Sequence, residues 1–224
     1  MKAAAVSKKL TNCVRIALWS AVALAGAFAS SVVAATPIEM TLPEGFTAEL
    51  VAGQPLVQHP LMACFDDRGR LYVSDAAGVN LDDKELDAQL PNGIRRLEDT
   101  DGDGRFDRST VFADRMTFPN GGVWHGDSLY VASAPYIWRL RDRDDDGVAE
   151  ERTQLVGKFG YIGNAADIHG CFMGPEGRLW WCDGRHGHEV HDAAGQLISK
   201  GLSLIHISEP TRLRRISYAV FCLK

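Results

Sequence analysis

Short apolar runs separated by glycine-rich turns dominate the chain. Three of them share one pattern, a turn followed by a β-rich run: 69–73 (GRLYV), 127–131 (DSLYV) and 177–181 (GRLWW). Their equivalent leucines, Leu71, Leu129 and Leu179, are 58 and 50 residues apart. Short strands that recur every 40–50 residues or so are typical of a β-propeller, in which four strands form each blade.

A second pair of runs repeats within the same region. Residues 94–97 (IRRL) recur as 137–140 (IWRL), 43 residues later. The polar stretch 79–91 is predicted to be a loop insertion in the first unit, with at most a short helix over 81–90. We therefore expect an all-β fold, an incomplete β-propeller with about three blades of a six-bladed ring. A β-sandwich stays open as the alternative, because alternating strands alone do not distinguish the two.

The N-terminal 35 residues have the layout of a secretory signal. Four basic and no acidic residues occur there, an apolar run covers 16–29, and Val33-Ala34-Ala35 fits a cleavage site. We expect cleavage after Ala35 and export to the periplasm or the cell surface. An uncleaved N-terminal anchor is the alternative.

The C-terminal 23 residues, 202–224, resemble a translated sequencing-library adapter. Residues 202–212 and 216–223 match its two ends in the right order and at the right spacing. A natural basic tail is the alternative. We expect the domain to be a partial propeller over 36–201, with the native protein continuing beyond Gly201. Because three blades leave two blade faces uncovered, we also expect this chain by itself to be inactive.

The charge balance excludes one class of partner. The chain has 24 Lys and Arg against 29 Asp and Glu, and residues 36–201 keep 16 basic and 28 acidic side chains. So acidic a domain is repelled by nucleic acid and by anionic membranes, but attracts divalent cations. We expect no nucleic-acid partner.

Three cysteines remain in the predicted domain, Cys64, Cys171 and Cys182. No C-x-x-C-H sequence is present, so we expect no haem in this fragment. If Gly174–Gly177 closes a simple hairpin, Cys171 faces Trp180 and lies only diagonal to Cys182. A disulfide between the two cysteines is then geometrically awkward.

Two acidic loops carry the clearest chemistry. Each matches D-x-D-x-D-G with a further acid at position 9, and the second loop follows the first by 43 residues. Carboxylates at positions 1, 3, 5 and 9, with the carbonyl at position 7, form an oxygen shell suited to Ca²⁺. The predicted ligands are Asp99, Asp101, Asp103, Arg105 and Asp107 in the first loop, and Asp142, Asp144, Asp146, Val148 and Glu150 in the second.

Position 12 of the loops distinguishes them from an EF-hand. It is Thr110 or Thr153 instead of a bidentate Glu, and no helices flank the loops, so we expect weaker binding and a structural ion. A solvated acidic hairpin without metal is the alternative.

A candidate catalytic segment spans residues 167–188, which are rich in His, Trp and Gly. His169 is predicted to lie at a strand end, where it can act as a general base toward an alcohol or hydrated aldehyde. A hydrogen-bonded structural histidine is the alternative. The His and Cys residues here fit no standard zinc spacing. Trp124-His125 is a second candidate, for which core packing is the favoured interpretation.

Several of these stretches together resemble the PVC-type membrane-bound dehydrogenases, whose propeller is similar to sorbosone and quinoprotein glucose dehydrogenases. The resemblance rests on 42–52 (LPEGFTAELVA), 65–73 (FDDRGRLYV), 99–107 and 110–114 (TVFAD). It implies a dehydrogenase-like domain, pyrroloquinoline quinone (PQQ) as cofactor and His169 as the base beside it. It also implies a cytochrome electron acceptor or a C-terminal haem domain.

Two functions follow as hypotheses. The first is an exported quinoprotein-like oxidoreductase that acts on sugars or related alcohols and aldehydes. The second is a non-catalytic, Ca²⁺-stabilised propeller that binds glycans or proteins.

Overall fold

The computed structural model describes residues 40–191, 195–201 and 220–223. The chain divides into two units, Met1–Pro37 and Ile38–Lys224, and the described residues all belong to the second. The predicted signal peptide and most of the predicted adapter segment, residues 202–219 and 224, lie outside the described residues.

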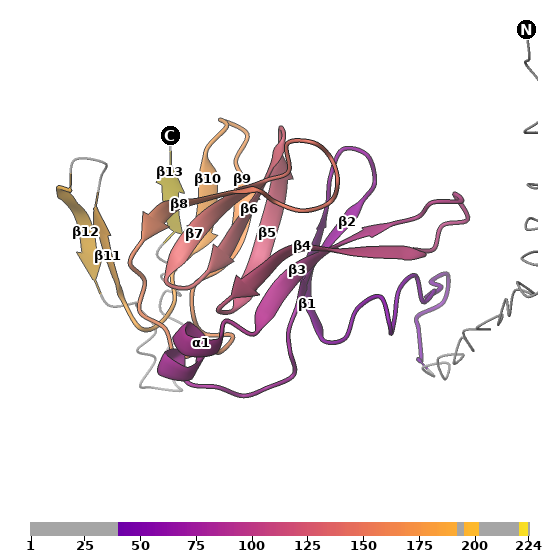
Figure 1. The fold of residues 1–224 in the computed structure, drawn as a ribbon, viewed down its shortest axis with the longest axis horizontal. Coiled ribbons are helices and arrows are strands. Elements are labelled where there is room, and N and C mark those ends of the chain that lie inside the picture. Colours follow the sequence, from indigo (N-terminus) through magenta and orange to yellow (C-terminus); the bar gives the residue numbers. More distant parts are fainter. Residues whose placement is uncertain (1–39, 192–194, 202–219, 224) are drawn as a thin grey trace, which may run out of the picture. The chain divides into compact units, whose positions relative to one another are not determined.

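The described residues are almost entirely β-structure with one short helix (Figure 1). In chain order the elements are β1 (Pro60–Phe65), β2 (Leu71–Asp75), α1 (Asp83–Gln89), β3 (Asn92–Glu98), β4 (Arg108–Met116), β5 (Pro119–His125), β6 (Ser128–Ser133), β7 (Tyr136–Arg141), β8 (Glu151–Gly157), β9 (His169–Met173), β10 (Leu179–Cys182), β11 (His188–His191), β12 (Leu197–Gly201) and β13 (Val220–Leu223).

Two complete four-stranded blades are present. Strands β1–β4 and β5–β8 each form an antiparallel sheet in sequence order. The repeated motifs occupy equivalent places, with Leu71 and Leu129 on the second strands, and Ile94 and Ile137 buried on the third. The predicted all-β, incomplete propeller is therefore confirmed.

The third unit departs from the predicted four-stranded blade. Strand β10 pairs with β9 on one edge and with β13 on the other, while β11 and β12 form a separate two-stranded ribbon. Strand β11 instead pairs with the segment that follows β8, through reciprocal backbone hydrogen bonds between Lys158 and Glu189. Because β13 occupies the edge of β10 where a third strand would pair, the unit is divided between two sheets.

Hydrophobic cores lie between successive blades, as a propeller requires. One core joins Tyr72, Ile94 and Phe112 of the first blade to Leu129 and neighbouring residues of the second. A second core joins the second blade to β9, β10 and β11. The second blade packs on the first through one core and on the third unit through the other, and this stacking of three sheets excludes a two-sheet sandwich for the described residues.

The first strands of the three units, β1, β5 and β9, lie side by side. Gly121 of β5 makes this close approach possible, because a Cβ there would lie 2.7 Å from the backbone nitrogen of Gly170 on β9 and 3.3 Å from Met62 of β1. The innermost strands thus meet at glycines directly beside His169.

The predicted short helix in the insertion is confirmed as α1. Asp82 and Glu85 form a capping box at its start, and Leu90 ends it in the left-handed conformation. Leu86 is buried against Gly163, and the Tyr161 hydroxyl donates to Asp87. The insertion of the first blade therefore contacts the segment that leads into β9.

The expected register of the β9–β10 hairpin is wrong by one residue. Met173 pairs with Leu179 and Phe172 pairs with Trp180, so Cys171 does not face Trp180. The connection between Met173 and Leu179 has five residues. Within it, Gly174 N–H donates to Arg178 O, and Gly177 takes a positive φ of 72°. A bulge then pairs Cys182 with His169, and Cys64, Cys171 and Cys182 are all free thiols.

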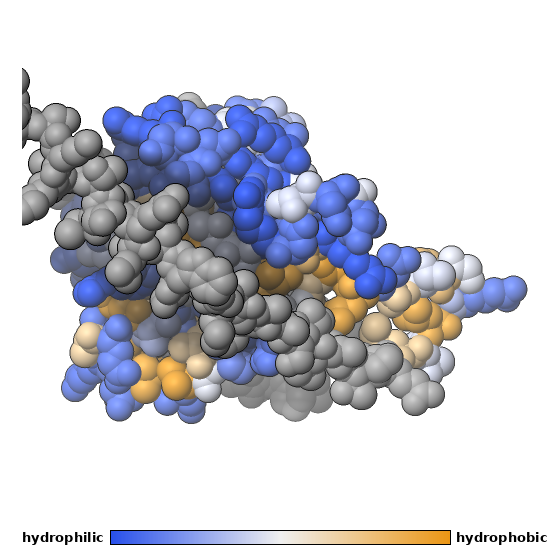
Figure 2. Space-filling model, turned by 45° about the vertical axis from the view of Figure 1, so that its right-hand side comes forward, coloured by the Kyte–Doolittle hydropathy of each residue, from blue (hydrophilic) through white to orange (hydrophobic). Residues whose placement is uncertain are grey.

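On the face drawn in Figure 2, hydrophilic residues predominate and apolar residues are exposed between them. On the innermost strand β1, Leu61, Met62 and Phe65 are 41, 40 and 62% exposed. Among the described residues, no helix is both long and apolar enough to cross a membrane.

Candidate functional site

The candidate residues lie at two opposite ends of the blades. Successive strands of a blade run antiparallel, so the β3–β4 and β7–β8 connections lie at one end. Those connections are the two acidic loops. The start of β9, with His169, lies at the other end together with the β2–β3 and β6–β7 connections. The predicted metal loops and the predicted base are therefore separate sites.

The first acidic loop is folded around its own backbone N–H groups. Asp99 at position 1 accepts from Gly102 N (2.7 Å) and Gly104 N (2.9 Å). These bonds, with that from Gly104 foremost, hold the Asp99 pKa below its usual range. One carboxylate oxygen each of Asp99, Asp101 and Asp103 lies within 4.8 Å of the others.

The second loop repeats this pattern position by position. Asp142 accepts from Asp145 N (2.7 Å) and Gly147 N (2.8 Å), and Asp146 accepts from Val148 N (2.8 Å). Here four carboxylates converge within 4.8 Å, those of Asp142, Asp144, Asp146 and Glu150.

Of the ten predicted ligands, Asp107 lies outside its cluster, and ligation by Arg105 and Val148 is untested. Asp107 is outside the first cluster, because the Thr100 hydroxyl donates to it at 2.6 Å. Position 2 of the second loop is Arg143, whose backbone N–H donates to Glu150 at 3.0 Å. Arg105 and Val148 take part through N–H groups that donate to position 5, and ligation by their carbonyls stays a prediction.

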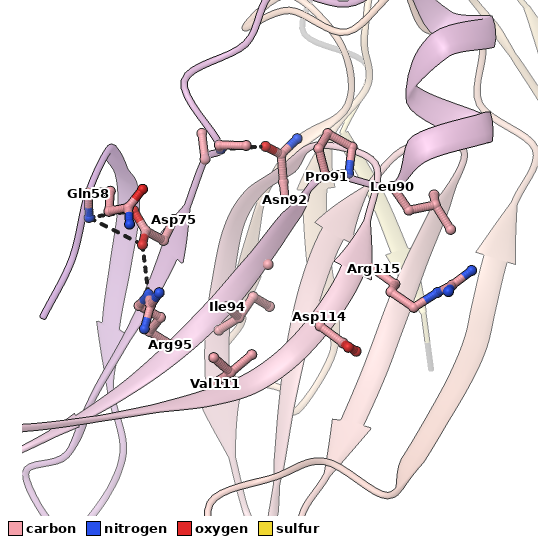
Figure 3. A pocket seen from close by; sticks show the side chains of 13 residues that line it. Gln58, Asp75, Leu90, Pro91, Asn92, Ile94, Arg95, Val111, Asp114 and Arg115 are labelled. Atoms are coloured by element: carbon pink, nitrogen blue, oxygen red, sulfur yellow. Dashed lines mark hydrogen bonds and ion pairs between the residues drawn. The ribbon is translucent and has the colours of Figure 1, made fainter. Parts of the chain in front are cut away.

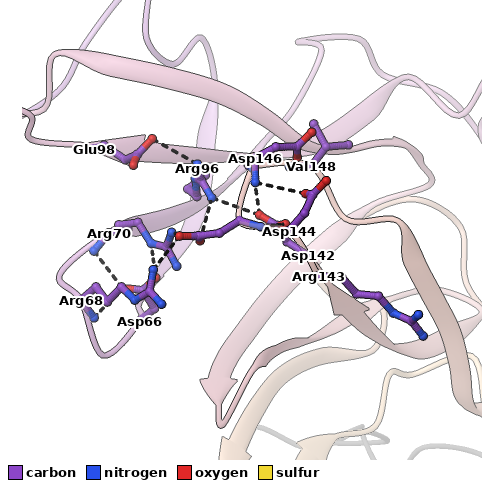
Figure 4. A network of polar contacts seen from close by, with 12 residues as sticks. Asp66, Arg68, Arg70, Arg96, Glu98, Asp142, Arg143, Asp144, Asp146 and Val148 are labelled. Carbon is purple, nitrogen blue, oxygen red and sulfur yellow. Dashed lines mark hydrogen bonds and ion pairs between the residues drawn. The ribbon is translucent and has the colours of Figure 1, made fainter.

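Arginines of the first blade distinguish the second loop from the first (Figure 4). Arg96 is 3% exposed and contacts Asp142 at 3.1 Å, Asp145 at 3.6 Å and Glu98 at 3.3 Å. Arg68 contacts Asp145 at 2.6 Å, and Arg70 pairs with the same carboxylate. The Arg70 hydrogen bond is the main reason why the pKa of Asp145 is lowered.

Gly147 is required for this contact. Its φ is +100°, and a Cβ there would lie 2.7 Å from Arg96 Nη2, whereas a Cβ on the equivalent Gly104 would meet nothing within 4 Å. Arg96, Arg68 and Arg70 were not predicted as site residues. They lie far from the loop in sequence, and only the packing of one blade on the next brings them to it.

At the opposite end, His169 is the first residue of β9 and is half-buried. Its Nδ1 lies 2.9 Å from the carbonyl oxygen of Asp167. A carbonyl only accepts, so Nδ1 carries the proton and donates, and Nε2 keeps its lone pair.

Two buried carboxylates near His169 were not predicted as functional. Asp167 is 1% exposed and accepts from the backbone nitrogens of Ile162, Gly163 and Asn164, at 3.1, 2.7 and 2.7 Å. Asp183 follows Cys182, the partner of His169, and accepts from His188 Nδ1 at 2.7 Å. Burial raises the Asp183 pKa, which the hydrogen bond from His188 opposes.

The alternative zinc set is not brought together. Within the described part of the chain, the only groups of three or more His, Cys, Asp or Glu ligands that converge are the two acidic loops. At the second candidate histidine, Trp124 packs against Tyr72 with ring centroids 5.1 Å apart, which confirms core packing there. His125 is exposed.

A cavity of about 330 Å³ in the first blade is lined by apolar residues and by polar groups, of which Asp75 and Asn92 already have hydrogen-bond partners (Figure 3). Asp75 accepts from His59 N (2.7 Å), Gln58 N (3.0 Å) and Arg95 Nε (2.8 Å). Asn92 accepts from Ala77 N at 2.9 Å. These contacts give the cavity a structural role, tying the segment before β1 to β2 and β3.

The described architecture is that of an incomplete β-propeller with acidic loops at one end and a histidine-containing loop cluster at the other. Residues 34–216 match a family model described as "Domain of unknown function (DUF7133)". The chain belongs to that family. No curated protein matches it.

Several solved structures are similar at low identity. They include a putative oxidoreductase (glucose dehydrogenase) from Thermus thermophilus, with 13% identity, a TM-score of 0.39, and coverage of 57% of this chain and 40% of that chain. The PQQ-bound aldose sugar dehydrogenase of Streptomyces coelicolor has 15% identity, a TM-score of 0.34, and coverage of 58% and 39%. A Trichoderma reesei carbohydrate-active enzyme of family AA12 has 15% identity and a TM-score of 0.40, and the match covers 73% of this chain and 47% of that chain.

The chain spans less than half the length of each of these proteins. Scores at this level carry no argument about activity. The family match runs past Gly201, and the boundary that we expect there stays a prediction.

Proposed function

We propose that the chain belongs to an exported, oxidoreductase-type propeller that oxidises a sugar or a related alcohol, with His169 as the base. Oxidation of an alcohol to a carbonyl releases a proton from the hydroxyl and a hydride from carbon. His169 accepts the hydroxyl proton on Nε2.

The observation that carries the proposal is the hydrogen bond from His169 Nδ1 to Asp167 O. It fixes the ring and its tautomer at the end of an innermost strand, where propellers build their sites. Asp167 is itself held by three backbone N–H groups, so the loop that presents this carbonyl is rigidly placed. A preorganised base of this kind typically contributes about 10²–10⁴-fold in rate.

The PQQ that the resemblance implies does not fit the described residues alone. PQQ is an aromatic tricarboxylate and needs cationic side chains around it. His169 does not line the cavities bounded by Asp75, Ser133, Lys158 or Tyr72. The nearby buried side chains, Asp167 and Asp183, are themselves carboxylates. We therefore derive no hydride-transfer step, and a quinone or cytochrome acceptor stays part of the proposal.

The test is sugar-dependent dye reduction by the natural protein that contains residues 36–201, assayed with Ca²⁺ and PQQ. His169→Asn retains a donor for Asp167 O but lacks the second nitrogen, so kcat should fall at least 100-fold. His191→Asn, at an exposed histidine of β11 that pairs with Glu189, is the matched control and should stay near wild type. Full activity of the His169→Asn protein would refute the role of His169.

A second candidate function is a non-catalytic propeller stabilised by Ca²⁺ that binds glycans or proteins. It is favoured by the repetition of the whole acidic-loop hydrogen-bond pattern, at the end of the blades away from His169. Glycan binding that persists in the His169→Asn protein, in the absence of any dye reduction by the wild type, would select this function.

A further inference from the structure

In the third unit, a serine contacts a histidine that in turn contacts an aspartate. Ser199 Oγ of β12 lies 2.8 Å from His188 Nε2, and His188 Nδ1 lies 2.7 Å from Asp183 Oδ2. An aspartate only accepts, so His188 Nδ1 carries the proton, and Nε2 is then the acceptor of the Ser199 hydroxyl proton. Both hydrogen bonds have the lengths found in nucleophile–base–carboxylate triads.

The strand register explains this alignment. In the β11–β12 ribbon, His188 pairs with Gly201 and Val190 pairs with Ser199. Alternate residues of a strand share a face, so His188, Ser199 and Gly201 lie on the same face of the ribbon. Gly201 leaves room there, since a Cβ at this position would lie 3.3 Å from His188 Cε1.

Burial differs along the three residues in the way that a triad requires. The side chains of Asp183 and His188 are 1% and 6% exposed, whereas Ser199 is only half-buried. The carboxylate is thus shielded from water, and Ser199 is the most exposed of the three residues.

A cleft of about 430 Å³ borders the histidine. His188 and Gly201 line it together with Lys158, His186 and Lys200. Ser199 is not one of its lining residues and adjoins the cleft through its contact with His188. Glycine backbone forms much of its wall, and its side chains are basic apart from Glu189, which pairs with Lys200 at 2.7 Å. Such a cleft suits a small polar or anionic acyl group.

We propose that Asp183, His188 and Ser199 form a nucleophilic site for acyl transfer from small carboxylic esters. Ser199 Oγ attacks the ester carbonyl carbon while His188 Nε2 takes its proton. The tetrahedral adduct breaks its bond to the ester oxygen, and His188 returns the proton to the leaving alcohol. Water, deprotonated by His188, then attacks the acyl-serine, which releases the carboxylic acid and restores Ser199.

This site is independent of the proposed oxidation, because it uses neither His169 nor an electron acceptor. The test is labelling of the full chain with a fluorophosphonate, which phosphonylates activated serines, followed by peptide mass spectrometry. Ser199 should be labelled at least 100-fold faster than the same residue in chain unfolded in urea. His188→Gln should abolish that excess, and Asp183→Asn should reduce it strongly.

Hydrolysis of p-nitrophenyl acetate supplies the second readout. It should be lost in Ser199→Ala, a variant that removes only an oxygen from a half-buried site, and retained in His169→Asn. Labelling of Ser199 no faster than in urea would overturn the proposal. So would unchanged ester hydrolysis in Ser199→Ala.

Discussion

The two acidic loops carry the same motif and the same internal hydrogen bonds but differ in what faces them. The loop at 99–107 has four carboxylates, and the described ion pairs include none that bridges its position 1 to an arginine. The loop at 142–150 has five, and Arg68, Arg70 and Arg96 of the neighbouring blade contact two of them. Arginines thus offset part of the negative charge of the second loop, through Asp142 and Asp145, whereas no described ion pair does so at Asp99, Asp101 or Asp103 of the first.

The largest effect is expected from removing the buried guanidinium. Arg96→Met leaves the largely buried Asp142 without its cation and leaves Glu98 with Arg108 alone. It should cost about 3–5 kcal/mol in free energy of unfolding by urea. Arg139, 43 residues later, is the matched control, since none of the described ion pairs involves it. Arg139→Met should cost under about 1 kcal/mol, and equal losses would show that the loops do not differ in this way.

Glycine substitutions sharpen the comparison at position 6. Gly147→Ala and Gly104→Ala both place a side chain at positive φ, which costs about 1–2 kcal/mol. Only Gly147→Ala also drives a Cβ into Arg96, which adds about 1–3 kcal/mol. Thermal melts should rank Gly147→Ala well below Gly104→Ala, and the reverse order would contradict the packing of Arg96 on this loop.

The smallest effect is expected at an exposed pair between the strands that follow the two loops. Arg152 of β8 contacts Asp114 of β4 at 2.8 Å, and this hydrogen bond lowers the Asp114 pKa. Arg152→Gln should cost about 0.2–1 kcal/mol at neutral pH, as for other exposed pairs. A lowered carboxyl pKa stabilises the fold above the ordinary value of about 4 and loses that contribution as the pH falls through the lowered pKa. The difference in melting temperature between variant and wild type should therefore vanish in strong acid.

The repeated part of the fold could be predicted from sequence because each repeat buries equivalent residues. The 43-residue spacing of Ile94 and Ile137 places both in the third strand of a blade, where both are buried. The acidic motif likewise specified its own loop geometry, since its hydrogen bonds are local. The one-residue error in the β9–β10 register arose because the sequence around Gly174 and Gly177 is compatible with a loop of either four or five residues.

The contacts between loops and blades could not be predicted in this way. Arg96 and Asp142 are 46 residues apart and meet only because the first blade packs on the second. Ser199 meets His188 only through the β11–β12 register, and no local motif marks it. The divided third unit depends on β13, whose pairing with β10 no pattern in residues 36–201 indicates.

The central claim is that the first loop depends on a bound cation more than the second. It is tested most directly by measuring the melting temperature against Ca²⁺ concentration for the wild type, Asp101→Ala and Asp144→Ala, residues at the same position of the two loops. Ca²⁺ should raise the melting temperature of the wild type. Asp101→Ala should lose most of that gain and Asp144→Ala the smaller part, because the arginines that contact Asp142 and Asp145 already offset part of the repulsion in the second loop. Equal losses in the two variants, or a wild type that does not respond to Ca²⁺, would contradict the account.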